Sequence, residues 1–211
     1  FCLSRGLGDV YKRQPLDRHL TRNSIIELGR CSLYAWEHIT MLVLLIGGVE
    51  MLDTLNVARY IINYSNQEKY GISNLRLQKL LYFVQAYYLI SSGNPCFDDR
   101  IEAWDFGPVV PVVYHEFKRF GGSSIPPVES YIVFNSDNFW DSHSALFDEK
   151  CLPDEDREKI RHVVDKFSDY STAELVSLTH NQRPWKDAYK DSQSNRVISN
   201  DSIKEYFQPT S

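Results

Sequence analysis

Beyond position 50, apolar residues recur every three or four positions along the chain, a spacing that predicts a succession of amphipathic helices. In the stretch 51–65, Asp53 can cap the first helix, and one apolar face is formed by Val57, Ala58, Ile61 and Ile62. The stretch 73–93 predicts a longer helix that Ser73 or Asn74 can cap. Apolar residues cover so much of its circumference that we expect it to be the central helix of the fold.

Four further helices and two short strands complete the pattern. The helices are predicted over residues 109–120, 154–170, 171–180 and 200–207. Ser171 and Glu174 form a capping box at the start of the third of these, and Asn200 is the expected cap of the last. Short strands are predicted at 101–104 and 131–134, the second within a polar segment that we expect to be a long loop or a small hairpin. The predicted fold class is mainly α, a compact five- to six-helix domain with at most a few short β-strands.

Residues 1–50 differ from the rest of the chain. They hold no sustained helical or alternating period, they start without Met, and their glycines and basic residues are scattered. We expect them to be an N-terminal extension outside the domain, either flexible or an artefact of gene calling. The domain itself is then expected to occupy residues 51–211.

Composition narrows the class of protein. The chain has 211 residues, of which 43% are hydrophobic, enough for one well-packed domain. A formal net charge of −5 without long runs of like charge makes nucleic acid an unlikely partner and gives no electrostatic grip on anionic lipid. Four widely spaced cysteines fit the reduced thiols of a cytoplasmic protein and disfavour a zinc site. The most apolar run, 41–49, is far shorter than the roughly 20 residues that cross a bilayer, so no membrane association is expected.

The sequence offers few groups for catalysis. Asp105, Phe106 and Gly107 spell the D-F-G of protein kinases, but the sequence lacks the glycine-rich loop and the H-R-D loop that give this motif its meaning. His180 stands at a predicted helix end, where it can hydrogen-bond the last carbonyl groups, a structural task. We expect no enzyme, no metal site and no cofactor. The alternative that stays open is a small-molecule-dependent enzyme or regulator with a cleft near Asp105, His115 and His180.

The stretch Trp104–Pro108 has a structural interpretation that needs no catalysis. Asp105 can accept hydrogen bonds from free amide groups at the start of the turn, and Gly107 permits a backbone conformation that other residues resist. Pro108 fixes the angle at which the next helix enters, and Trp104 is expected to bury its ring against the central helix. This stretch is predicted to be a joint that aims a helix.

Three separated signatures occur in order along the chain. They are Leu-Gln-Lys-Leu-Leu-Tyr-Phe at 77–83, Ala-Trp-x-x-Gly-Pro-Val at 103–109 and Thr-His-x-x-x-Pro-Trp at 179–185. Together they resemble the Panacea domain, the family of SocA-like antitoxins and GepA-like phage-associated proteins, over residues 51–211. The family positions that this resemblance implies, mainly structural, are Leu77, Gln78, Lys79, Leu80, Leu81, Tyr82, Phe83, Ala103, Trp104, Asp105, Gly107, Pro108, Val109, Tyr114, Thr179, His180, Pro184 and Trp185.

The resemblance also implies a function. It indicates a bacterial or prophage antitoxin that neutralises a cognate toxin protein, encoded by an adjacent gene, by direct protein–protein binding. Some members of the family resemble proteolytic adaptors, which implies a cytoplasmic protease as a second partner. We expect the choice of toxin to depend on residues 123–150, where Tyr131 and Trp140 are candidate anchors for the partner. A DNA-binding regulator is disfavoured by the net charge and by the lack of a basic recognition helix.

Overall fold

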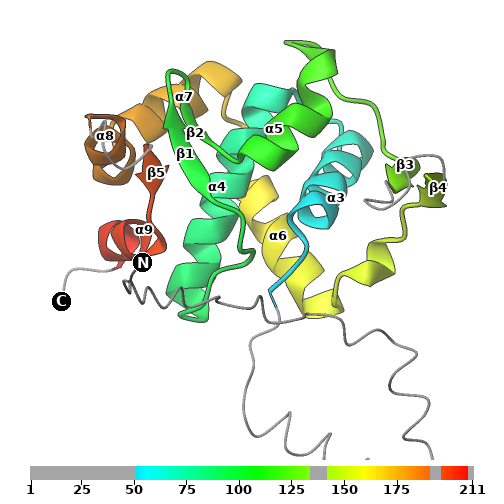
Figure 1. The fold of residues 1–211 in the computed structure, drawn as a ribbon, viewed down its shortest axis with the longest axis horizontal. Coiled ribbons are helices and arrows are strands. Elements are labelled where there is room, and N and C mark those ends of the chain that lie inside the picture. The colour runs from blue at the N-terminus through cyan, green and yellow to red at the C-terminus, as the bar shows by residue number, and fades with distance from the viewer. Residues whose placement is uncertain (1–50, 134–141, 191–195, 209–211) are drawn as a thin grey trace, which may run out of the picture. The chain divides into compact units, whose positions relative to one another are not determined.

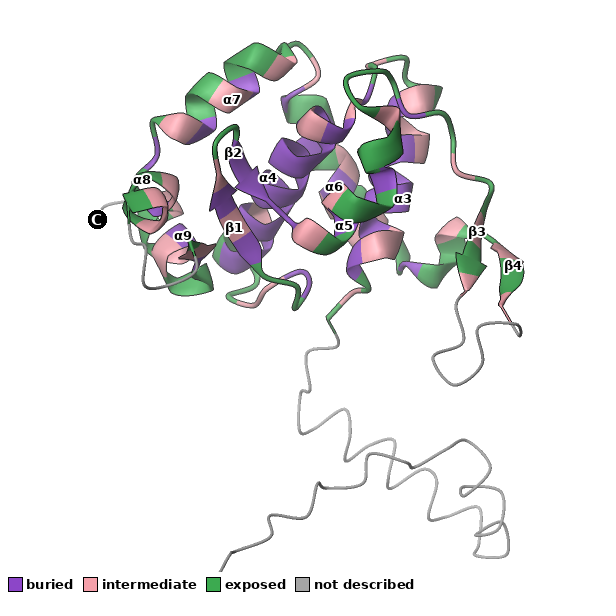
Figure 2. Ribbon diagram, turned by 45° about the horizontal axis from the view of Figure 1, so that its top comes forward, coloured by how far each residue is buried: buried purple, intermediate pink, exposed green. Residues whose placement is uncertain are grey.

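The fold is organised around α4 (Asn74–Ser91), as expected for the central helix (Figure 1). A computed structural model describes residues 51–133, 142–190 and 196–208 of the chain. Fourteen of the 18 residues of α4 are buried, including polar ones, so neighbouring elements surround it on all sides (Figure 2). Ser73 caps the helix by accepting a hydrogen bond from the backbone N–H of Arg76.

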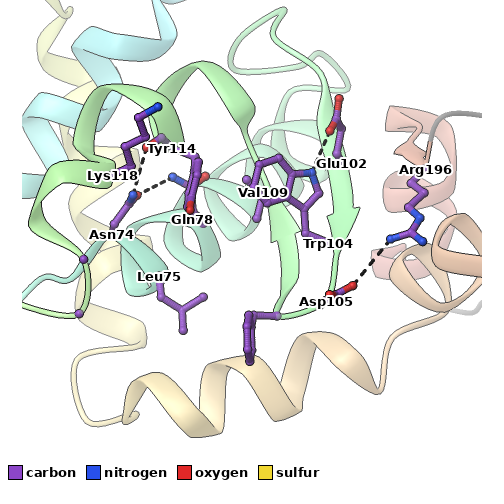
Figure 3. A pocket seen from close by; sticks show the side chains of 13 residues that line it. Asn74, Leu75, Gln78, Glu102, Trp104, Asp105, Val109, Tyr114, Lys118 and Arg196 are labelled. Atoms are coloured by element: carbon purple, nitrogen blue, oxygen red, sulfur yellow. Dashed lines mark hydrogen bonds and ion pairs between the residues drawn. The ribbon is translucent and has the colours of Figure 1, made fainter.

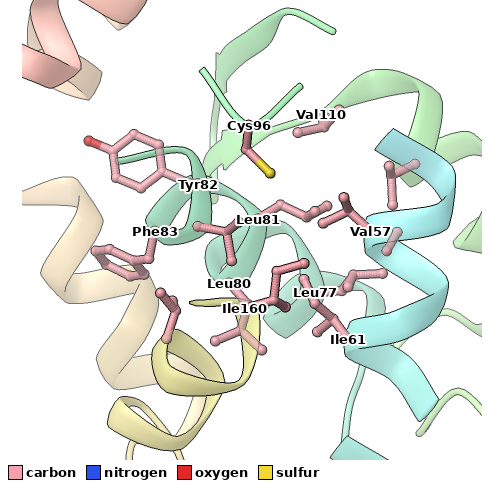
Figure 4. Close-up of a cluster of buried hydrophobic side chains, with 14 of the residues drawn as sticks. Val57, Ile61, Leu77, Leu80, Leu81, Tyr82, Phe83, Cys96, Val110 and Ile160 are labelled. Atoms are coloured by element: carbon pink, nitrogen blue, oxygen red, sulfur yellow. The ribbon is translucent and has the colours of Figure 1, made fainter. Parts of the chain in front are cut away.

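Helices α3 (Thr54–Gln67) and α6 (Asp154–Lys166) pack against α4 and form the main hydrophobic core (Figure 4). The face predicted for α3 is confirmed, since Val57, Ala58, Ile61 and Ile62 are all fully buried. The predicted cap is confirmed as well, because the carboxylate of Asp53 accepts the backbone N–H of Asn56 at 2.8 Å. Each helix therefore starts and faces the core as its local sequence dictates.

A three-stranded antiparallel sheet lies beside α4. It comprises β1 (Ile101–Trp104), β2 (Gly107–Val109) and β5 (Val197–Ile198), in the order β2-β1-β5. Strand β1 matches its prediction, whereas β2 corrects one, because a helix was expected from about residue 109. The chain instead pairs with β1 through Val109, and α5 (Pro111–Phe117) begins two residues later with Pro111 in its first turn. A 3₁₀ turn, η1 (Lys118–Phe120), then ends the helical segment before the predicted stop at Gly121.

A second hairpin follows, within the segment expected to be a loop or small hairpin. Strands β3 (Ser130–Val133) and β4 (His143–Leu146) pair antiparallel, and the 3₁₀ turn η3 (Glu149–Cys151) leads into α6. Residues 134–141 between the two strands lie outside the described part of the chain, so the candidate anchor Trp140 stays a sequence prediction. The same holds for the interpretation of residues 1–50.

The C-terminal region contains α7 (Thr172–His180), α8 (Arg183–Lys190) and α9 (Asn200–Phe207). The capping box of Ser171 and Glu174 is confirmed at the start of α7. Helix α8 was not predicted, and with it the described residues hold seven α-helices in a mainly α fold. The cap of α9 is Ser199 and not Asn200, whose side-chain oxygen instead accepts a hydrogen bond from Gln85 of α4 at 3.0 Å.

Candidate functional site

The turn between β1 and β2 packs closely against α4 and α7 at Gly107. Gly107 has φ +99°, in the region that favours glycine, and a Cβ there would lie 2.8 Å from both the Nζ atom of Lys79 and the Oγ1 atom of Thr179. Lys79 reaches the strand directly, because its Nζ donates a hydrogen bond to the carbonyl oxygen of Pro108 at 2.8 Å. The glycine of the signature is therefore required both by backbone conformation and by space.

Lys79 is a fully buried ammonium group. Loss of solvation lowers its pKa to about 7, since burial penalises the charged form. The pKa of the nearby His180 is lowered too, first by burial and then by the positive charge of Lys79, while the backbone of Asp105 opposes the shift. Burial therefore disfavours the protonated form of both side chains, and the charge of Lys79 adds to this effect at His180.

The tip of the turn is clamped from the side by α8 and by Arg196. The indole of Trp185 donates a hydrogen bond to the carbonyl oxygen of Trp104 at 3.0 Å. Asp105 accepts the hydroxyl of Tyr189 at 3.0 Å and lies 3.7 Å from the guanidinium of Arg196. Asp105 is therefore held by side chains, which corrects the expectation that it accepts free backbone amides.

An aromatic stack supports this clamp. The rings of His180 and Trp185 are stacked with centroids 4.1 Å apart, and Trp185 stacks on Tyr189 at 4.7 Å. The guanidinium of Arg196 lies over the ring of Tyr189, 4.8 Å from its centroid. His180 and Trp185 of the third signature thus connect α7 and α8 to the β1–β2 turn through ring stacking and the indole hydrogen bond to Trp104. The Nε2 atom of His180 is buried without a hydrogen-bond partner among the described residues, so it does not make the expected bond to the last carbonyl groups of α7.

Beside the turn lies a pocket of about 680 Å³, which we call the aromatic pocket (Figure 3). It opens between the start of α4, the β1–β2 hairpin and α5, and its apolar lining comprises Leu75, Trp104, Phe106, Val109 and Tyr114. Trp104 is only half-buried, and its ring meets the edge of Tyr114 at a centroid distance of 4.9 Å. The expectation that Trp104 buries its ring against the central helix is thus wrong: the ring forms one wall of an open pocket.

Polar groups at the base of the aromatic pocket already have partners inside the chain. The side chain of Gln78 accepts the backbone N–H of Val110 at 2.8 Å and donates to Asn74 at 3.0 Å. Asn74 in turn donates to the carbonyl oxygen of Tyr114 at 3.1 Å. These bonds tie α4 to α5 and β2, so the polar atoms of Gln78 act as structural links.

Phe106 stands at the rim of this pocket and was not identified as a contact residue from the sequence. Its side chain is 67% exposed although the turn that carries it is held on two sides. Exposed aromatic residues on rigid turns are typical of contact surfaces. One sequence signal could have indicated this exposure: Phe106 occupies one of the two unspecified positions of the second signature, where no packing role is required.

The β3–β4 hairpin forms a second exposed apolar surface. Ile132 is 59% exposed and Leu146 is 82% exposed, and the strand register places them on the same face. We call these two side chains the hairpin face. Tyr131, the predicted anchor, points to the other side of the hairpin, where the guanidinium of Arg59 lies 3.7 Å from its ring centroid. A further pocket of about 450 Å³ opens between this hairpin and η1.

The remaining signature residues are packing residues. All seven side chains at 77–83 are buried, and so are Ala103, Gly107, Pro108, Val109, Thr179 and Pro184. Tyr82 donates a buried hydrogen bond of 2.8 Å to Gln182, and burial raises the pKa of its hydroxyl. The signatures therefore mark the contacts between α4, the β1–β2 hairpin and α7.

The residues proposed for an enzymatic cleft are not gathered in the aromatic pocket. Of Asp105, His115 and His180, only Asp105 lines it. Within the described ranges, no group of three or more His, Cys, Asp or Glu side chains is placed to hold a metal ion. Among those same residues, none of the helices combines the length and the apolar character that a bilayer span requires.

Comparison with known proteins gives two matches. Residues 77–186 match the family model described as "Antitoxin SocA-like, Panacea domain", which is more than half of the chain. A stretch of 72 residues, 34% of this chain, is 42% identical to the protein named "Antitoxin SocA" from Caulobacter vibrioides (strain NA1000 / CB15N). The matched stretch spans 38% of the length of that relative. No solved structure matches the chain.

Proposed function

Because the chain belongs to the family of SocA-like antitoxins with a Panacea domain, we propose that it neutralises a cognate toxin by direct protein–protein binding. The toxin is expected to be encoded by an adjacent gene. Binding of this kind requires a complementary surface and no catalytic group. The proposed role is therefore that of a non-enzymatic binding protein.

The hairpin face is the observation that carries this proposal beyond family membership. Ile132 and Leu146 expose aliphatic side chains at diagonal positions on one face of the hairpin, in the segment 123–150 that we expect to determine the choice of partner. Contiguous exposed apolar side chains are typical of protein–protein contacts. Strands β3 and β4 pair only with each other in the described part of the chain, so the outer edge of either strand is open to a partner.

The net charge of the chain favours a basic partner. A formal charge of −5 gives the chain an acidic character, and many toxins that act on nucleic acid or ribosomes are basic. Opposite charges speed the encounter of two proteins and fix their orientation, with less effect on the affinity itself. We therefore expect the rate of complex formation to fall as salt concentration rises.

Co-expression tests the proposal. The full chain and the product of the adjacent reading frame are produced together in a bacterial host, and growth and co-purification are recorded. We expect the neighbour alone to arrest growth and the chain to relieve the arrest through a stable complex. A toxic neighbour that neither binds the chain nor is neutralised by it would contradict the proposal.

A bound antitoxin can neutralise its toxin by covering it or by delivering it to a cytoplasmic protease. The half-life of the toxin, measured with and without the chain in hosts that have or lack the protease, separates these two routes. A proteolytic adaptor shortens the half-life only in the host that has the protease, whereas steric neutralisation leaves it unchanged or longer. Either result leaves direct binding as the first step.

A further inference from the structure

The base and the aromatic walls of the aromatic pocket are suited to an apolar side chain. Its volume of about 680 Å³ lies in the range of pockets that bind ligands, roughly 300–1,000 Å³. The amide groups of Gln78 and Asn74 at its base already form hydrogen bonds inside the chain. The indole N–H of Trp104 is also occupied, since it donates to the carboxylate of Glu102 at 2.8 Å.

These internal bonds decide the class of ligand. A polar molecule that reaches the base of the pocket must give up its hydrogen bonds to water, and the amides of Gln78 and Asn74 there already have partners inside the chain. An apolar side chain loses no hydrogen bonds on entry, and it gains contact with Leu75, Val109 and the rings of Trp104 and Tyr114. The lining therefore favours an aromatic or large aliphatic group.

Phe106 adds an aromatic contact at the rim of the pocket. The turn that carries it is held by Trp185, Tyr189 and Arg196, so little backbone freedom remains to be lost when a partner binds. Charged residues of both signs, Asp105, Lys118 and Arg196, also line the pocket. An apolar centre within a polar rim is the usual arrangement of a protein–protein contact.

We propose that the aromatic pocket and Phe106 form an anchor site that receives a large apolar side chain from the cognate toxin. This inference rests on the antitoxin function proposed above. It assigns the toxin a defined chemistry: a segment that presents an aromatic or aliphatic residue to the groove between α4, α5 and the β1–β2 hairpin. Position 106 is one of the two that the Ala-Trp-x-x-Gly-Pro-Val signature leaves unspecified, so its side chain can vary with the partner while the turn is kept.

Calorimetry with the full chain and the purified toxin tests the anchor site. Phe106→Ala is expected to weaken binding about thirtyfold or more, the loss typical of a central aromatic contact. Leu75→Trp, which fills the pocket, is expected to weaken it as well. The melting temperature of Phe106→Ala should stay that of the unchanged chain, because its side chain is 67% exposed. Tyr206→Ala is the matched control, since Tyr206 is a 42% exposed aromatic residue outside the pocket, and it should bind normally.

Cross-linking identifies the segment of the toxin that enters the aromatic pocket. A photoreactive phenylalanine analogue at position 106 of the full chain should link to the toxin, and mass spectrometry of the product locates the linked segment. We expect that segment to contain a large apolar residue whose replacement by Asp abolishes the complex. The same analogue at position 206 should give no link.

The outcomes separate this inference from the proposed function. If the unchanged chain forms no complex with the toxin, the antitoxin proposal fails and the anchor site fails with it. If the complex forms and both Phe106→Ala and Leu75→Trp bind as tightly as the unchanged chain, only the anchor site is wrong. Binding of a hydrophobic dye in the pocket that saturating toxin does not displace would also overturn the anchor site.

Discussion

The two hairpins of the domain have strands of similar length but differ in their relation to the core. In the β1–β2 hairpin, Ile101, Ala103 and all of β2 are buried, and Lys79 reaches in from α4 to bond the strand. In strands β3 and β4 every residue is exposed or half-exposed. The first hairpin carries a family signature and the second carries none. The specified residues of the signature thus pack the joint. We propose that partner choice depends on side chains that the signatures do not specify: the hairpin face, and Phe106 at the tip of the first hairpin.

Gly107→Val changes the β1–β2 turn and should lower the stability of the protein more than any other substitution considered below. The new side chain would meet Lys79 and Thr179 at 2.8 Å from its Cβ atom in a backbone conformation that valine resists. We expect the free energy of unfolding to fall by more than about 4 kcal/mol, measured by chemical denaturation, and neutralisation to be lost with it.

Gly122→Val is the control for this substitution. No atom lies within 4 Å of a Cβ at position 122, so its stability should change little. A Gly107→Val variant that stays fully stable yet no longer binds the toxin would show that the second signature is a contact surface and not a joint.

The pH dependence of stability tests the buried ammonium group beneath the joint. The pKa of Lys79 is about 7 in the folded chain against an ordinary value of 10.5. Between these two values the unfolded chain binds one proton more than the folded chain, so the stability from this residue rises with pH across that window and is lowest below pH 7. The slope is at most about 1.4 kcal/mol per pH unit.

Lys79→Met removes the titrating group while keeping most of the side-chain length. The free energy of unfolding of both proteins is measured by denaturation from pH 6 to pH 9. As pH rises, the stability of the unchanged chain should increase relative to that of Lys79→Met. A difference that is constant with pH would mean that Lys79 keeps its charge in the folded protein.

Gln78→Leu tests the link between α4 and the end of β2. The substitution leaves the buried backbone N–H of Val110 without the acceptor that now lies 2.8 Å away. An unpaired buried amide costs about 1–3 kcal/mol, which urea denaturation resolves. Gln67→Leu, on the exposed end of α3, is the control and should be neutral. Equal stability of the two variants would exclude a structural role for Gln78.

The sequence predicted those elements whose signals are local. Asp53 and the Ser171–Glu174 box cap helices because both partners lie within one turn of each other. Strand β2 was missed because Pro108 lies at its centre. A proline is tolerated there because β2 is at the edge of the sheet, where among the described residues it pairs with β1 alone. Helix α8 was missed because Pro184 was interpreted as following a helix end, although proline is equally compatible with a first turn.

The candidate site was harder to predict, since it depends on contacts distant in sequence. Lys79 lies among apolar residues in the sequence, but its full burial follows from the approach of Gly107 and Thr179, 28 and 100 positions away. Phe106 was interpreted as part of the joint. In the structure Trp185 and Tyr189 bond to its neighbours Trp104 and Asp105, and the ring of Phe106 is exposed to solvent. The polar segment around 131–134 was expected to be a long loop or a small hairpin, and it holds the β3–β4 hairpin. Its exposed large apolar residues are Ile132 and Leu146, whereas the predicted anchor Tyr131 is half-buried.

The hairpin face should give the smallest change in stability and a clear change in binding. Ile132→Ser and Leu146→Ser remove exposed side chains, so the free energy of unfolding should move by no more than about 0.5 kcal/mol. Co-purification with the toxin should decline for both variants. Ile90→Ser, a 37% exposed aliphatic residue at the end of α4, is the control that should leave the toxin bound. A large loss of melting temperature in the hairpin variants would place these side chains in a core.

Hydrogen exchange of the full chain, free and bound to the toxin, tests the division between joint and contact surface most directly. We predict new protection on binding at residues 104–107, 130–133 and 143–146. The signature helix at 77–83 should be protected already in the free chain, because its side chains are buried. Protection that appears at 77–83 on binding, with no change in the two hairpins, would contradict the proposal that the signatures pack the domain and the exposed hairpin surfaces bind the partner.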